Sequence, residues 1–152
     1  MKKHILFVCT GNTFRSASAD YLFEHLLEQK QDNSYMVSSA GTRGNPLGVY
    51  KETIQKVKTY GVDMSAHKYR ILTQKIIDDA DIIICMSQVH IDFIKEHFGT
   101  SSYLFNELAI GEKVDLKDDD EAYGEYSDLG EFIVMTVETI YSRLPGLYAK
   151  LK

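Results

Sequence analysis

The sequence FVCTGNTFRSASAD, residues 7–20, joins an apolar run to a segment with a helical pattern. Residues 5–9 are almost continuously hydrophobic, as in the strands of a parallel sheet that is buried on both faces. Residues 17–28 carry apolar side chains at helical spacing. Cys9 stands six residues before Arg15, so both lie at a predicted strand-to-helix turn.

The rest of the chain repeats this alternation. Further strand-like runs occupy residues 35–39, 82–86 and 103–105. Helical patterns occupy residues 49–60, 73–79, 88–97 and 128–144, and we expect the last helix to end at Pro145-Gly146. The alternation predicts an α/β fold, a four-stranded parallel sheet with helices on both faces. Because no repeat or linker divides the chain, we expect one domain over residues 1–152.

Composition narrows the class of protein. With 152 residues and 44% hydrophobic side chains, the chain is long enough to bury a core. The formal net charge of -5 argues against a nucleic-acid partner, and no apolar run is long enough to span a membrane. Two cysteines and no signal-peptide pattern favour a reducing, cytoplasmic location.

The segment from Cys9 to Ser16 reads C-x5-R-S, at the edge of the sheet where ligands of α/β proteins bind. Backbone N–H groups, a helix N-terminus and the Arg15 guanidinium together suit a phosphate and favour the thiolate form of Cys9. We therefore expect Cys9 to be a nucleophile that attacks phosphorus, with Ser16 stabilising the thiolate as it leaves. The expected phosphate-binding residues are Thr10, Gly11, Asn12, Thr13, Phe14 and Arg15.

Other chemistries fit these residues less well. Cys9 as a merely buried thiol and Arg15 as a surface residue would leave the strand–loop–helix context unexplained. A Walker-type loop needs G-x4-G-K-[ST], which is absent from the sequence, and the spacing of Cys9 and Cys85 does not suit zinc. The sequence suggests no metal and no organic cofactor.

The chain resembles the low-molecular-weight protein tyrosine phosphatases along nearly its whole length. The likeness rests on C-T-G-N-T-x-R-S at residues 9–16, S-A-G-T at 39–42, G-V-D-M-S-A-H at 61–67 and A-D-I-I-I-C-M at 80–86. The resemblance implies a Rossmann-like domain, a cysteinyl-phosphate intermediate and a general-acid aspartate late in the chain. It also implies that Asn12 holds the shape of the loop and that His67 supports Ser16 and the loop.

The general acid is sought in the stretch KDDDEAYGEYSD, at residues 117–128. The family pattern D-P-[YF]-[YF]-G matches Asp120, Tyr123 and Gly124, so Asp120 is the first candidate and Asp118 the second. Tyr123 is expected to line the substrate cleft, because residues 43–50 lack a recognisable aromatic wall.

The resemblance predicts a phosphatase that acts on phosphotyrosine in proteins. Thr13 keeps phosphoarginine as the alternative substrate, because arginine phosphatases of this fold carry threonine there and a hydroxyl can contact a guanidinium leaving group. An arsenate reductase would need further reactive cysteines near the loop. A phosphate-binding module without turnover would not need the nucleophile Cys9.

Overall fold

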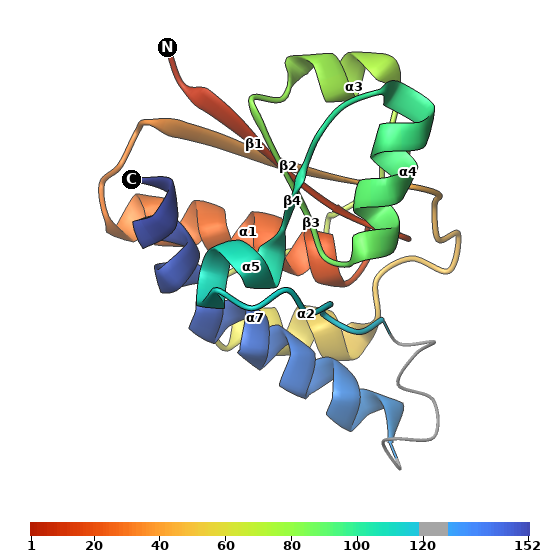
Figure 1. The fold of residues 1–152 in the computed structure, drawn as a ribbon. Coiled ribbons are helices and arrows are strands. Elements are labelled where there is room, and N and C mark those ends of the chain that lie inside the picture. Colours follow the sequence, from red (N-terminus) through yellow and green to blue (C-terminus); the bar gives the residue numbers. More distant parts are fainter. Residues whose placement is uncertain (119–127) are drawn as a thin grey trace.

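The computed structural model describes residues 1–118 and 128–152, and its core is a parallel sheet (Figure 1). In these residues the sheet has four strands in the order β2-β1-β3-β4. The strands are β1 (Lys3–Cys9), β2 (Tyr35–Gly41), β3 (Ile82–Cys85) and β4 (Tyr103–Leu104). The predicted α/β class and the four predicted strands are confirmed.

Strand β1 lies between β2 and β3. Its Ile5 is opposite Val37 on one side and Ile82 on the other. Residues 5–8 of β1 are completely buried, which explains their unbroken hydrophobic run. The chain passes from β1 to β2 on one side and returns to β3 on the other, so a crevice opens beyond the carboxyl ends of β1 and β3.

Helices cover both faces of the sheet (Figure 1). They are α1 (Arg15–Gln29), α2 (Lys51–Lys58), α3 (Gln74–Asp79), α4 (Gln88–Phe98), α5 (Phe105–Ile110) and α7 (Leu129–Leu151). Helices α1, α2, α5 and α7 pack on one side, around a core that includes Phe7 and Phe23. Helices α3 and α4 pack on the other, around a core that includes Leu6 and Ile94. Alternate residues of β1 therefore enter different cores.

The predicted end of the last helix is wrong. Helix α7 continues through Pro145 to Leu151. A side chain at Gly146 would overlap the Ala109 carbonyl oxygen, so this glycine allows α7 to approach α5 closely and does not end the helix. Burial of Leu147 and a 2.8 Å hydrogen bond from the Tyr148 hydroxyl to Asp32 hold the last turns in place.

Candidate functional site

The turn after β1 is held against the end of β2. The backbone N–H of Thr42 donates to the Cys9 carbonyl at 3.0 Å, and that of Arg43 donates to the Thr10 carbonyl at 3.0 Å. A side chain at Gly41 would meet the Thr10 carbonyl oxygen, so the close approach requires glycine. The sheet thus fixes the start of the loop that carries Cys9.

Asn12 fixes the middle of the loop. It is fully buried and has a φ of 55°, so the left-handed turn of the loop lies at Asn12. Its amide N–H donates to Ser16 at 2.9 Å, and its amide oxygen accepts the Arg70 N–H at 2.9 Å. The ring Nε2 of His67 donates to the Asn12 carbonyl at 2.7 Å. His67 therefore has an indirect connection to Ser16: it hydrogen-bonds to Asn12, and Asn12 hydrogen-bonds to Ser16.

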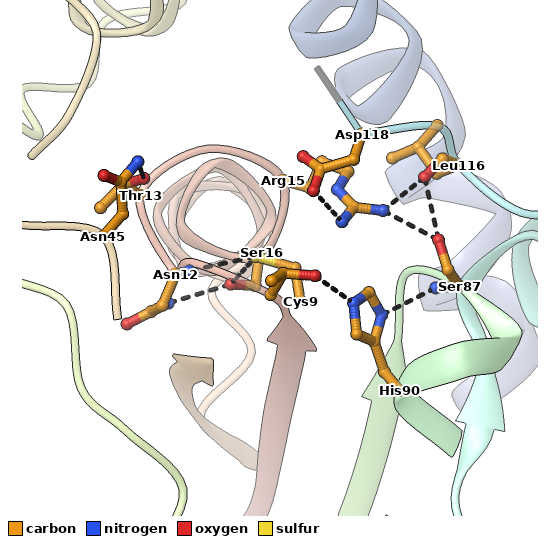
Figure 2. Close-up of polar contacts among 11 residues, drawn as sticks. Cys9, Asn12, Thr13, Arg15, Ser16, Asn45, Ser87, His90, Leu116 and Asp118 are labelled. Carbon is orange, nitrogen blue, oxygen red and sulfur yellow. Dashed lines mark hydrogen bonds and ion pairs between the residues drawn. The ribbon is translucent and has the colours of Figure 1, made fainter. Parts of the chain in front are cut away.

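The Cys9 sulfur lies among hydrogen-bond donors at the end of β1 (Figure 2). The Asn12 backbone N–H donates to it at 3.3 Å, and the Ser16 hydroxyl oxygen is 2.9 Å away. Because Ser16 already accepts a hydrogen from the Asn12 amide, its own O–H proton is available to the sulfur. Both contacts stabilise negative charge on sulfur.

The Arg15 guanidinium is 1% exposed and contacts three groups of the protein (Figure 2). Nη1 donates to the Ser87 hydroxyl at 2.8 Å and to the Leu116 carbonyl at 2.6 Å. Nη2 is 3.1 Å from Oδ2 of Asp118. Within residues 1–118 and 128–152, its buried Nε has no hydrogen-bond partner. The edge formed by Nε and Nη2 suits two oxygens of a tetrahedral anion.

His90, a buried histidine that the sequence did not single out, links Ser87 to the Cys9 loop. Its Nδ1 accepts the Ser87 backbone N–H at 3.1 Å, so the proton of neutral His90 is on Nε2, which donates to the Thr10 hydroxyl at 2.9 Å. Burial, with a smaller contribution from Arg15, lowers the pKa of His90 to about 3. The available sequence signal was Ser-x-x-His at the start of α4, a capping arrangement.

A cavity of about 400 Å³ opens above Cys9. One wall contains the rings of Phe14 and Tyr50, whose centroids are 6.5 Å apart in an edge-to-face arrangement. Thr13 and Asp118 also line the cavity. The expectation that residues 43–50 lack an aromatic wall is therefore wrong at Tyr50, where no fixed sequence pattern signals the ring.

The two predictions on the acid loop, Asp120 as the acid and Tyr123 in the cleft, concern residues 119–127, outside the described residues. Asp118, the second candidate for the acid, is described and faces the cavity. Cys85 is fully buried at the end of β3, and burial raises its pKa to about 12. No group of three or more His, Cys, Asp or Glu side chains in the described part of the chain could hold a metal ion. Nor is any helix there long and apolar enough to cross a membrane.

Comparison with known proteins identifies the family. Residues 4–152 match the model of the low molecular weight phosphotyrosine protein phosphatases. The chain belongs to this family. The match confirms the predicted family. It also confirms the prediction that the protein is a phosphatase, which is a kind of hydrolase.

The names of the similar proteins and solved structures refer to two kinds of substrate. A protein-arginine-phosphatase of Bacillus subtilis is 36% identical over 97 residues, which span 62% of this chain and 63% of that protein, less than two thirds of its length. The low molecular weight protein-tyrosine-phosphatase PtpB of Staphylococcus aureus is 30% identical over 97% of this chain and 96% of its own. A YwlE mutant from B. subtilis superposes with a TM-score of 0.85 at 25% identity over 99% of both chains. A cysteine-to-serine mutant of the YwlE arginine phosphatase with a phosphorylated active-site serine has a TM-score of 0.84 at 26% identity, over 97% of this chain and 95% of its own.

The buried His90 predicts a specific dependence of stability on pH. Below pH 6.5 the unfolded chain protonates this histidine, whereas the folded chain does so only near pH 3, so folding loses stability as the pH falls between these values. From pH 7 to pH 5 the free energy of unfolding is expected to fall by about 2 kcal/mol through this residue alone. Urea unfolding of the wild type and of His90→Gln at both pH values measures the difference.

His97→Gln is the matched control, because His97 is exposed on the same helix. This variant should keep the full pH dependence of the wild type. A difference in stability between wild type and His90→Gln that is the same at pH 5 and pH 7 would contradict the assignment.

Proposed function

We propose that this phosphatase hydrolyses phosphotyrosine in proteins through a phosphate covalently bound to Cys9. The observation that carries the proposal is the Cys9 sulfur at the floor of the cavity, with donors from Ser16 and Asn12, and Arg15 in the same loop with its Nε unpaired and its Nη2 paired with Asp118. The phosphorylated serine of the arginine phosphatase mutant supports a covalent step in a protein of this fold.

In the first step the substrate phosphate binds the Nε and Nη2 edge of Arg15 and takes the place of Asp118 there. The Cys9 thiolate attacks phosphorus, an S–P bond forms, and the P–O bond to the phenol breaks with its electron pair on oxygen. A protonated Asp118 donates its proton to that oxygen, so tyrosine leaves as a neutral phenol. The dianionic phosphate that is bound to Arg15 favours the protonated form of the displaced Asp118 carboxyl group, because two nearby negative charges repel each other.

In the second step water attacks the same phosphorus atom. The Asp118 carboxylate accepts the proton of the water, and the S–P bond breaks with its electron pair on sulfur. Hydrogen bonds from Ser16 and from the Asn12 N–H stabilise the returning thiolate, which is the leaving group of this step. Orthophosphate is released and the enzyme returns to its starting state.

Asp118 takes the role of acid in this proposal because of its position. Its carboxylate lines the cavity and lies 3.1 Å from the guanidinium that would hold the phosphate. Asp120, the better match to the family pattern, remains the competing candidate. The two are separated by experiment below.

Phosphoarginine is the second candidate substrate, and Thr13 favours it. The guanidinium leaving group carries N–H donors and needs an acceptor in the cavity, which the Thr13 oxygen offers. The aromatic wall of Phe14 and Tyr50 favours the phenyl ring of phosphotyrosine instead. The relatives named for each substrate support both candidates.

A cytoplasmic location and one catalytic domain over residues 1–152 belong to the same proposal. Both cysteines are free thiols, as is usual in a reducing compartment. The family model spans residues 4–152, which supports one domain.

Replacing the proposed nucleophile tests the covalent step. Cys9→Ser is expected to abolish hydrolysis of para-nitrophenyl phosphate, because a neutral hydroxyl is a much weaker nucleophile than a thiolate. Rapid acid quench of the wild type during turnover should give a peptide with phosphate on Cys9, detected by mass spectrometry. Cys85→Ser, at the buried thiol, should retain activity. An active preparation in which phosphate never appears on Cys9 would refute the mechanism.

Two aspartate variants identify the acid. Asp118→Asn is expected to lower kcat for phenyl phosphates by roughly 10²-fold, the usual contribution of a general acid. Asp120→Asn, the matched control two residues away, should change kcat much less. The reverse order of effects would assign the role to Asp120.

Phosphate release from two peptides that differ only in phosphotyrosine or phosphoarginine separates the substrates. If Thr13 contacts the guanidinium, Thr13→Val should lower kcat/KM for phosphoarginine roughly tenfold and leave phosphotyrosine nearly unchanged. No release from the phosphoarginine peptide by the wild type would eliminate that candidate. No release from either would contradict the proposed function itself.

A further inference from the structure

Asn45 forms the polar wall of the cavity together with Thr13 (Figure 2). Its side-chain Nδ2 donates to the Thr13 hydroxyl oxygen at 3.2 Å. Its Oδ1 accepts the backbone N–H of Leu47 at 3.1 Å. Because Oδ1 is occupied by a donor, the amide has a defined orientation in which the N–H side faces Thr13.

The segment that carries Asn45 is attached to the Cys9 loop. The Arg43 backbone N–H donates to the Thr10 carbonyl, and the Asn45 Cβ lies 3.1 Å from the point where a Cβ at Gly11 would be. Asn45 is therefore held close to Thr13 by its backbone as well as by its side chain.

This contact decides which side of Thr13 is polar. A threonine carries a methyl and a hydroxyl on the same carbon, and rotation about χ1 exchanges them. The hydrogen bond from Asn45 favours the rotamer that turns the oxygen toward the wall they share. Thr13 is only 3% exposed, so whichever group it turns to the cavity is a fixed part of the wall.

We propose that Asn45 is a positioning residue that selects for a guanidinium leaving group by holding the Thr13 hydroxyl. The inference rests on the proposed function, in particular on phosphoarginine as substrate. With one lone pair occupied by Asn45, the Thr13 oxygen keeps a second lone pair for an N–H of phosphoarginine. Without Asn45 the methyl group is free to turn inward, which suits the ring of phosphotyrosine better.

A double-mutant cycle on selectivity tests this. The quantity measured is the ratio of kcat/KM for the phosphoarginine peptide to that for the matched phosphotyrosine peptide. Asn45→Ala is expected to lower this ratio about fivefold, the scale of one hydrogen bond. In a Thr13→Val background the same substitution should leave the ratio unchanged, because Asn45 then has no hydroxyl to hold. Asn33→Ala, an exposed asparagine near the opposite end of β2, is the control and should not change the ratio.

The ratio separates positioning from damage to the fold, since a general loss of active enzyme lowers both rates equally. An unchanged ratio in Asn45→Ala, or an equal change with Thr13 and with Val at position 13, overturns this inference alone. Absence of phosphoarginine turnover in the wild type overturns it together with the phosphoarginine candidate, while phosphotyrosine turnover would still support the proposed function. Absence of both activities in the wild type would overturn this inference, the phosphoarginine candidate and the proposed function together.

Discussion

The buried charge of Arg15 is the constraint on which the rest of the site depends. A guanidinium that is 1% exposed has lost its hydration and needs partners from the protein. It finds them on two segments: the Ser87 hydroxyl after β3, and the Leu116 carbonyl and Asp118 carboxylate after α5. These contacts draw the segments around the turn after β1. The same need for a counter-charge makes the Nε and Nη2 edge of Arg15 a receptor for an anion that displaces Asp118 from Nη2, so one positive charge serves both folding and phosphate binding.

The loop is held by hydrogen bonds on its buried side and lines the cavity on its other side. Behind it, Asn12 is tied to Ser16, Arg70 and His67, so the donors to the Cys9 sulfur have fixed positions before any substrate arrives. Preorganised donors of this kind stabilise a developing charge without having to reorganise during the reaction. The Asp118 carboxylate, which lines the cavity, and Asn45, which donates a hydrogen bond to the Thr13 hydroxyl, come instead from two segments outside the loop.

The sequence predicts well what depends on neighbours along the chain. The four strands follow from their apolar runs, and the loop follows from a thiol and an arginine at a strand-to-helix turn. Contacts between distant segments leave no such pattern: His90 reaches Thr10 across 80 positions, and Arg15 reaches Leu116 across 101. The same limit explains the wrong end of α7. Pro145-Gly146 usually ends a helix, but here burial of Leu147 and close packing of Gly146 on α5 outweigh the local preference.

The cavity above Cys9 has an aromatic side and a polar side, and this difference bears on substrate choice more than Cys9 and Arg15 do. The thiolate and the guanidinium act on the phosphoryl group, which is the same in a phosphate ester and a phosphoramidate. What differs is the leaving group, a flat apolar ring in one case and a flat array of N–H donors in the other. The edge-to-face pair of Phe14 and Tyr50 suits the first, and the Thr13 oxygen suits the second. Because a planar guanidinium also stacks on aromatic rings, the preference of this wall for the phenyl ring is the smaller of the two effects. A correctly turned hydroxyl is the stronger discriminator, because only one of the leaving groups can donate a hydrogen bond to it.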